Sequence, residues 1–170
     1  SKVLPEPWVL SPEPCYDPHV RIRETARVAV VIVNYQSYDE LHGCLASIER
    51  ACGGASVVVI DHSSNAEAAD VLSERFPDVQ LRRVASNDGF AAGVNNGARA
   101  TSSPFILLLN PDCVVEPEAC CRLADWLEGH PDVAVAGPRI RNADGTVQPS
   151  ARRFPDFTTA IAGRSSSPKA

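Results

Sequence analysis

The sequence predicts an α/β fold, in which a doubly wound, mostly parallel sheet carries helices on both faces. Two observations support this prediction. Short apolar runs rich in valine, isoleucine and leucine recur along the 170 residues, and stretches with the apolar spacing of a helix separate them. Strands buried on both faces read as continuous apolar runs, and strands that alternate with helices pair in parallel. The length suits one domain with a substantial core.

The first half of the predicted sheet starts with a β-branched run over Ala26–Asn34. A helix follows, because apolar residues recur with helical spacing at Leu41, Cys44, Leu45, Ile48 and Cys52. Gly53 and Gly54 end this helix, and Ser56–Asp61 forms the second strand. A second helix, closed by Pro77, has its apolar residues at Ala68, Val71, Leu72 and Phe76.

The second half continues the alternation of strands and helices. Three more strands are expected, over Val79–Ala85, Phe105–Leu109 and Val133–Gly137. The helices between them are one of small residues over Gly89–Ala100 and one with apolar residues at Cys120, Leu123, Ala124 and Leu127. The turn sequence Asn142–Gly145 then predicts a small hairpin near the C-terminus, between residues 139–141 and 146–148.

The boundaries of the domain follow from composition. Residues 1–26 form a proline-rich lead-in without periodicity, and residues 158–170 read as a flexible, serine-rich tail. The folded domain is therefore expected over residues 27–157. The lead-in has no signal-peptide pattern, and no apolar run approaches the ~20 residues that span a bilayer.

Charge and cysteine usage restrict the function. The net charge is -5 and no block of lysine or arginine occurs, which argues against binding to nucleic acid. The six cysteines form no CxxC pair, so a structural zinc site has little support. Cys44 and Cys120 fall on apolar helix faces, where cysteine acts as a small hydrophobe. These features favour a reduced, cytoplasmic setting.

Polar residues follow four of the predicted strands where each strand ends. They are Asn34-Tyr35, Asp61, Asn87 and Asn110-Pro111-Asp112. A doubly wound sheet brings such strand ends to one edge, which is where its ligands bind. Asp112 could supply the carboxylate that Mg²⁺ takes together with substrate phosphates. An ordinary turn explains Asn110–Asp112 equally well, and an Asx turn or helix cap explains Asp61.

The stretch from Asn87 to Gly97 places three glycines at Gly89, Gly93 and Gly97 in a helical region, where each costs about 1 kcal/mol relative to alanine. Either a ligand or a closely packed element would justify them. Asn95 and Asn96 are expected to be exposed or to pack against another element, and a side chain that faces the crevice is the alternative.

Several known nucleotide and hydrolase motifs are missing. The sequence has no GxGxxG, no GxxxxGK[ST] and no GxSxG, which argues against a dinucleotide enzyme, a P-loop NTPase and an α/β-hydrolase. The four histidines, which include His62, lack the spacing of metal ligands and are expected to be ordinary surface or cap residues.

Six segments in order resemble the family 2 glycosyltransferases, which have the Rossmann-like GT-A fold, and the rhamnosyltransferase-like branch in particular. The segments are Val28–Tyr35, Val57–Asp61, Asn87–Gly97, Leu107–Pro117, Val133–Ile140 and Asp144–Pro155. The resemblance implies a nucleotide-sugar-binding domain that uses dTDP-rhamnose or a UDP-sugar and inverts the anomeric carbon. Its products would be polysaccharides or glycoconjugates, and its acceptor a saccharide or glycolipid.

The resemblance also implies roles for the residues at the sheet edge. Asn34 and Tyr35 would line the nucleobase pocket, and Asp61 would hydrogen-bond the base. Asn87, Gly89, Phe90 and Asn95 would border the nucleotide and sugar. Asn110 and Asp112 stand at the family's DxD motif, where Asp112 would bind Mg²⁺ or Mn²⁺ on the diphosphate.

This sequence departs from the family pattern in several places. Asn110 replaces the first DxD carboxylate, Asp88 replaces a basic residue, and His62 replaces an asparagine. No Glu-Asp pair follows Asp112, so no general base is identified. The alternative function is therefore a non-catalytic module that binds a nucleotide sugar or a partner. The resemblance also allows peripheral membrane association, and a partner chain that supplies the acceptor half.

Overall fold

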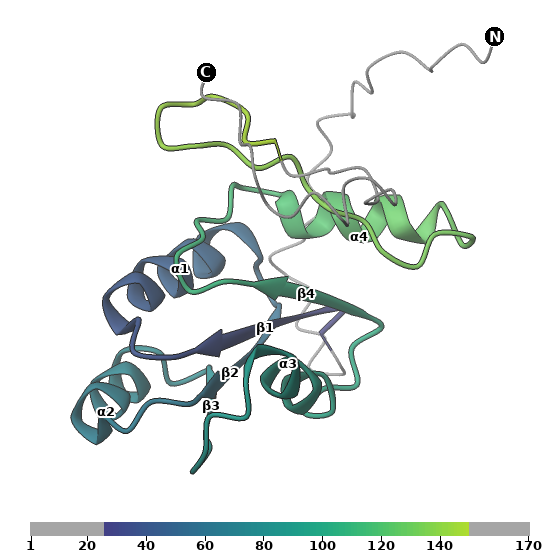
Figure 1. Ribbon diagram of the computed structural model, residues 1–170. Helices are drawn as coiled ribbons and strands as arrows, with labels where there is room; N and C mark the ends of the chain where they lie inside the picture. Colours follow the sequence, from purple (N-terminus) through teal and green to yellow (C-terminus); the bar gives the residue numbers. More distant parts are fainter. Residues whose placement is uncertain (1–25, 150–170) are drawn as a thin grey trace, which may run out of the picture. The chain divides into compact units, whose positions relative to one another are not determined.

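The structure of the protein is a computed structural model that describes residues 26–149 (Figure 1). The tail predicted over residues 158–170 and all but the last residue of the predicted lead-in lie outside this range. The chain divides after Ala136 into two compact units, and each is considered by itself.

The first unit alternates strands and helices as the sequence predicts. Its elements are β1 (Val28–Asn34), α1 (Tyr38–Ala51), β2 (Ser56–Asp61), α2 (Ala66–Arg75), β3 (Gln80–Arg83), α3 (Phe90–Ala98), β4 (Phe105–Leu109) and α4 (Ala119–Glu128). The four strands pair in parallel in the order β3-β2-β1-β4. β2 and β3 therefore lie in succession on one side of β1, and β4 lies on the other side of β1. This reversal confirms the doubly wound sheet and puts a switch point between β1 and β4.

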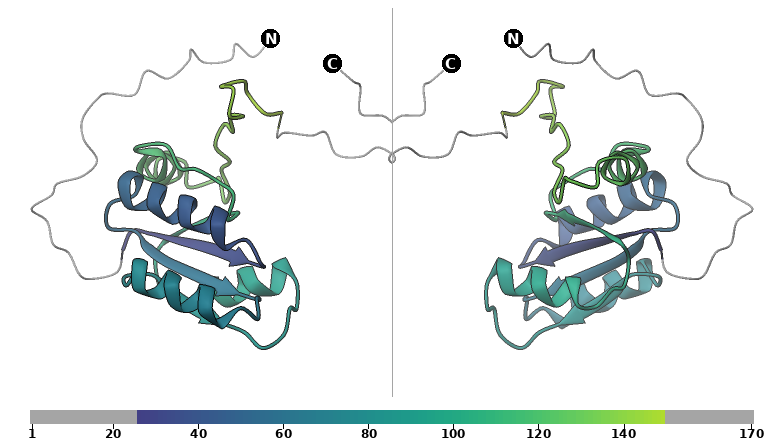
Figure 2. Two further views of the ribbon diagram at one scale, coloured as in Figure 1. Left: turned by 90° about the vertical axis from the view of Figure 1, so that its left-hand side faces the viewer. Right: turned by 90° about the vertical axis from the view of Figure 1, so that its right-hand side faces the viewer.

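The core lies on both faces of β1, whose residues Ala29–Ile32 are almost fully buried. On one face, Val30 and Ile32 belong to a cluster that also contains apolar residues of α1 and α2 and Cys120 of α4. On the other face, α3 packs against β1 and β2. Figure 1 shows α1 and α3 on opposite sides of β1, and Figure 2 shows the strands between them. Helices on both faces are therefore confirmed.

Two glycines let α3 approach the sheet closely. A Cβ atom at Gly93 would lie 2.8 Å from Val33 Cγ1 and 2.9 Å from His62 Nε2, and a Cβ atom at Gly97 would overlap Val31 Cγ1. Both glycines are buried. Packing of the helix on the sheet is thus the observed reason for these two glycines.

We expect Gly97→Ala to destabilise the protein by about 1–3 kcal/mol, the usual cost of forcing extra volume into a packed core. Gly43→Ala is the matched control, because Gly43 is also helical but has no atom within 4 Å of the added Cβ. That change should raise stability by about 0.5–1 kcal/mol. Urea unfolding of the two variants and the wild type measures both effects. Equal midpoints for the two variants would contradict the close packing of α3.

The sequence prediction for Cys120 was wrong. Cys120 forms a disulfide with Cys52, which links the C-cap of α1 to the first turn of α4. Both cysteines had been assigned to apolar helix faces and both are buried. Their helical spacing gives no sign of pairing, because residues 68 positions apart meet only through the tertiary fold. The prediction for Cys44 holds, since Cys44 is a buried free cysteine.

The fifth strand, predicted over Val133–Gly137, does not form. Val135 is 85% exposed. A strand needs a neighbour for its backbone N–H and C=O groups, and this segment pairs with none of the described strands. β4 is consequently an outer strand of the described sheet, and its Ile106 and Leu108 are 43% and 48% exposed.

The second unit contains the predicted hairpin in reduced form. Arg141 and Val147 form one antiparallel bridge around the turn over residues 142–146. Gly145 adopts a φ of 84°, which glycine tolerates without strain. The turn sequence was therefore interpreted correctly, and two full strands do not form in the described residues.

Candidate functional site

The C-terminal ends of β1, β2 and β4 meet at one edge of the sheet. Asn34 lies beside Asp61 in the parallel register, and Leu109, the last residue of β4, lies beside Ile32. β2 and β4 flank β1, so their ends are two strand spacings apart, or ~10 Å. The segments that carry Asp61 and Asp112 therefore leave the sheet at the same edge, on either side of Asn34.

Asp61 is fully buried and forms the centre of a hydrogen-bond network. Its Oδ1 accepts from Asn34 Nδ2 at 2.9 Å and from the backbone N–H of Ser63 at 3.1 Å. Its Oδ2 accepts from the Tyr38 hydroxyl at 2.6 Å. The bond to Ser63 is the Asx turn considered from the sequence. A buried carboxylate needs such donors, so the network holds Asp61 at the end of β2.

Three residues of this network were not identified from the sequence. Tyr38, in the first turn of α1, bonds Asp61, and Ser63 Oγ accepts from the backbone N–H of Gln36 at 2.7 Å. Gln36 has a φ of 58°, a left-handed conformation that is uncommon for residues other than glycine. The polar cluster Asn34–Tyr38 was the available signal, but its contacts to Ser63 depend on strand pairing.

The Tyr38 hydroxyl should make stability depend on pH in alkaline solution. Burial, followed by the hydrogen bond to Asp61, raises the pKa of Tyr38 from 10.0 to about 12. Between these values the folded chain keeps the phenolic proton and the unfolded chain loses it. Stability from this group is thus complete below pH 10 and is lost as the pH rises toward 12. We expect Tyr38→Phe to flatten this decline in urea unfolding, and parallel pH profiles would contradict it.

The segment after β4 forms a turn, which was one of the two interpretations of Asn110–Asp112 from the sequence. The backbone N–H of Cys113 donates to the Asn110 carbonyl at 3.2 Å. Asp112 is exposed, and its carboxylate accepts a long hydrogen bond of 3.9 Å from the Cys113 thiol. The turn therefore presents the Asp112 carboxylate to solvent, at the edge of the sheet where β1, β2 and β4 end.

A divalent cation fits this donor set only with help from a ligand. The described residues contain no group of three or more histidine, cysteine or acidic side chains that could hold a metal. Mg²⁺ is commonly bound by one or two carboxylates plus substrate phosphates. Asp112 could supply one such carboxylate.

The start of α3 borders the same edge. Asn87 Oδ1 accepts from the backbone N–H of Gly89 at 3.1 Å, and Gly89 is the N-cap with a φ of 89°. Phe90 follows and is 56% exposed, and Tyr35 after β1 is 53% exposed. Asn95 lies further along α3 and is exposed. Exposed aromatic rings beside polar side chains suit a flat, polar ligand such as a nucleobase.

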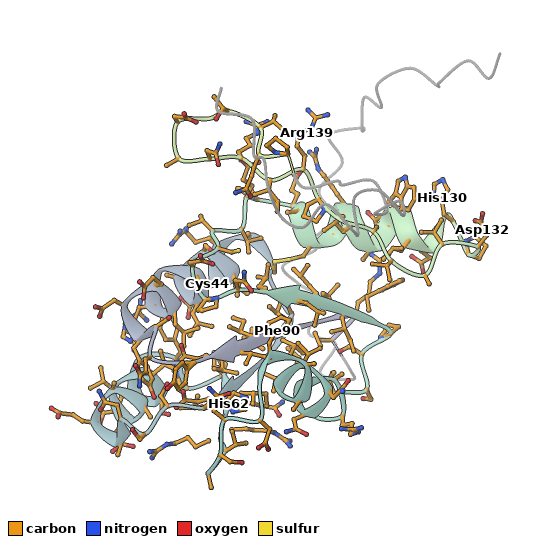
Figure 3. All side chains as sticks on the ribbon, viewed as in Figure 1. Cys44, His62, Phe90, His130, Asp132 and Arg139 are labelled. Atoms are coloured by element: carbon orange, nitrogen blue, oxygen red, sulfur yellow. A yellow bond between two sulfur atoms is a disulfide. The ribbon has the colours of Figure 1, made fainter. Side chains whose placement is uncertain are left out.

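His62 was predicted to be a surface or cap residue, and this was wrong. It is buried, its Nδ1 lies 2.9 Å from the Ser86 carbonyl, and its Nε2 has no hydrogen-bond partner among the described residues. A carbonyl only accepts, so Nδ1 carries a proton. His62 thus connects β2 to the loop before α3, and Figure 3 shows it at the lower side of the sheet.

The fold defines a class of protein, an α/β domain of the GT-A glycosyltransferase type. The family model for glycosyl transferase family 2 matches residues 29–168. The chain belongs to this family.

Relatives and solved structures agree with this assignment. An N-acetylglucosaminyl-diphospho-decaprenol L-rhamnosyltransferase of Mycobacterium tuberculosis is 30% identical over 140 residues, which are 75% of this chain and 46% of that protein. S. aureus TarS 1-349 with UDP-GlcNAc superposes with a TM-score of 0.55 at 17% identity, covering 61% of this chain and 33% of that one.

The mannosyltransferase PcManGT of Pyrobaculum calidifontis, solved with GDP-Man and Mn²⁺, gives a TM-score of 0.52 at 23% identity over 72% of this chain and 36% of that one. These likenesses support the fold. The chain spans about half the length of the M. tuberculosis relative. Within residues 26–149, no helix is long and apolar enough to cross a membrane.

Proposed function

We propose that this chain binds the nucleotide diphosphate sugar of a family 2 sugar transfer reaction, with dTDP-rhamnose or a UDP-sugar as donor. The observation that carries the proposal is the placement of Asp61 and Asp112 after β2 and β4, on either side of β1. A distance of ~10 Å between the strands suits a ligand with a base at one end and a diphosphate at the other. The L-rhamnosyltransferase relative favours rhamnose as the donor sugar.

The base would lie at the Asp61 network. Asn34 and Asp61 are fully buried, whereas Tyr38, which donates to Asp61 Oδ2, is half-buried, so we propose that a base approaches the Asp61 carboxylate from the Tyr38 side. In the proposed complex an N–H group of the base replaces the Tyr38 hydroxyl as donor to Oδ2. The exposed rings of Tyr35 and Phe90 would cover the faces of the base and sugar.

The diphosphate would lie at the end of β4. Asp112 would hold Mg²⁺ or Mn²⁺ there, and the bound ion would offset the negative charge of the departing nucleotide. Asn87 and Gly89, at the start of α3, would border this position together with Asn110, and the N-terminus of α3 favours an anion. The negative charge of Asp88, whose carboxylate accepts a hydrogen bond from the Ser86 hydroxyl at 2.9 Å, opposes an anion at this position.

The reaction would be a direct displacement with inversion, in which an acceptor hydroxyl replaces the nucleotide at the anomeric carbon. The acceptor, a saccharide or glycolipid, and the group that takes its proton are assigned to a further half of the enzyme or to a partner chain. We propose that the chain is able to associate peripherally with a membrane.

Calorimetry with UDP and dTDP, with and without Mn²⁺, tests the donor site. We expect Asp112→Asn to remove the gain in affinity that Mn²⁺ provides, at least tenfold, because the ion loses its protein carboxylate. Asp78→Asn is the matched control, since Asp78 is also exposed but precedes β3 at the opposite edge. Metal-dependent binding that survives in Asp112→Asn would show that Asp112 does not hold the ion.

A second candidate function is a module that binds a nucleotide sugar without turnover. Incubation with UDP-GlcNAc or dTDP-rhamnose separates the two functions. Release of free nucleotide in proportion to the concentration of the chain would support a transferase, and binding without any release would support the module.

A further inference from the structure

The turn that carries Asp112 has little regular structure of its own. Residues 110–118 connect β4 to α4, and Val114 within them is 74% exposed. Two backbone bonds stabilise the segment internally, from Cys113 to Asn110 and from Ala119 to Glu116. A carboxylate on so exposed a connection needs anchoring from elsewhere to keep one position.

Ser47 of α1 provides one anchor. Its side chain is buried and its hydroxyl donates to the Cys44 carbonyl at 2.6 Å. Because the hydroxyl proton is committed to that bond, the oxygen can act only as an acceptor on its other side. There it accepts from the backbone N–H of Val115 at 2.9 Å, three residues after Asp112.

Two further contacts come from the same buried side of α1. The Cys44 thiol donates to the Asn110 carbonyl at 3.7 Å, and Cys52 forms the disulfide with Cys120. Burial raises the pKa of Cys44 to about 12, so the thiol keeps the proton that this bond requires. Figure 3 shows Cys44 on α1. The partners of residues 110, 115 and 120 follow one another along α1 and its C-cap, and the first two contacts flank Asp112 in the sequence.

We propose that Ser47 is a positioning residue of the donor site, which fixes the backbone on the C-terminal side of Asp112 while the Cys44 thiol fixes it on the N-terminal side. This inference rests on the proposed function. It assigns to α1 a role in metal-dependent donor binding although Ser47 itself is buried and touches no ligand.

Ser47→Ala tests the inference in the full chain, because alanine retains the helix and the volume but cannot accept from Val115. We expect the Val115 amide to exchange its hydrogen about tenfold faster, since its acceptor is lost. We also expect affinity for UDP or dTDP, whichever binds more tightly, to fall about fivefold in the presence of Mn²⁺, the effect of one neutral hydrogen bond. Affinity for the corresponding nucleoside should not change.

Ser73→Ala is the matched control. Ser73 Oγ also donates to a carbonyl of its own helix, that of Ala69 at 3.0 Å, but lies on α2 away from the turn. Unchanged exchange at Val115 in Ser47→Ala, or equal effects in the two variants, would overturn the inference. If the wild type binds neither nucleotide, the proposed function fails, and exchange at Val115 still decides whether Ser47 holds the turn.

Discussion

Replacing Asp61 with alanine is expected to destabilise the protein by about 2–5 kcal/mol, because buried donors lose their acceptor and each such loss costs ~1–3 kcal/mol. The donors are Asn34 Nδ2 and the backbone N–H of Ser63, both in buried residues, and the Tyr38 hydroxyl, which is less buried. Urea unfolding at pH 7 measures the loss. Asp70→Ala is the control, since Asp70 is exposed on α2 and such surface changes stay within about 0.5 kcal/mol.

Asp61→Asn separates a structural role from a binding role. The amide oxygen can still accept from Asn34 and Ser63, so we expect most of the stability to remain. The amide nitrogen cannot accept from a nucleobase N–H, so binding of UDP and dTDP should fall at least tenfold if the base lies at Oδ2. Nucleotide affinity equal to that of the wild type would leave Asp61 with a structural role alone.

The sequence predicted most of the first unit because its strands are buried on both faces. Runs such as Val28–Asn34 and Ser56–Asp61 have no alternation, which indicates a parallel sheet before any partner is known. The prediction failed for Val133–Gly137, where the apolar pattern was present but no described strand pairs with it. Local pattern predicts the tendency of a segment to form a strand, whereas its pairing partner is a property of the whole fold.

The candidate site was predicted in outline and not in detail. The ends of buried strands can be predicted from the sequence, and Asn34, Asp61 and Asp112 each follow such an end. Tyr38, Ser63 and Ser47 were missed because their contacts join different elements. For Asp61, an Asx turn and a ligand site are not exclusive alternatives. A carboxylate has several acceptor positions, so Asp61 can form the turn and still accept from a ligand.

The Cys52–Cys120 disulfide should contribute about 4 kcal/mol to stability, because it closes a loop of 68 residues in the unfolded chain. We expect dithiothreitol to lower the guanidinium unfolding midpoint of the wild type by a corresponding amount. Cys120→Ala should show the lower midpoint with or without the reductant. Cys121→Ala is the matched control, because Cys121 is a free cysteine beside Cys120 and should behave like the wild type in both conditions.

The state of the Cys52–Cys120 pair also indicates whether the compartment in which the chain works is oxidising or reducing. Disulfides are rare in reducing compartments, so the Cys52–Cys120 bond counts against the reduced, cytoplasmic setting that the cysteine pattern predicted. Peptide mapping of protein purified without reductant should recover the peptides of Cys52 and Cys120 as one linked species. The bond joins α1 to α4 immediately after the turn that carries Asp112, so its reduction should weaken Mn²⁺-dependent nucleotide binding as well as stability. A midpoint and an affinity that are both insensitive to complete reduction would contradict this coupling.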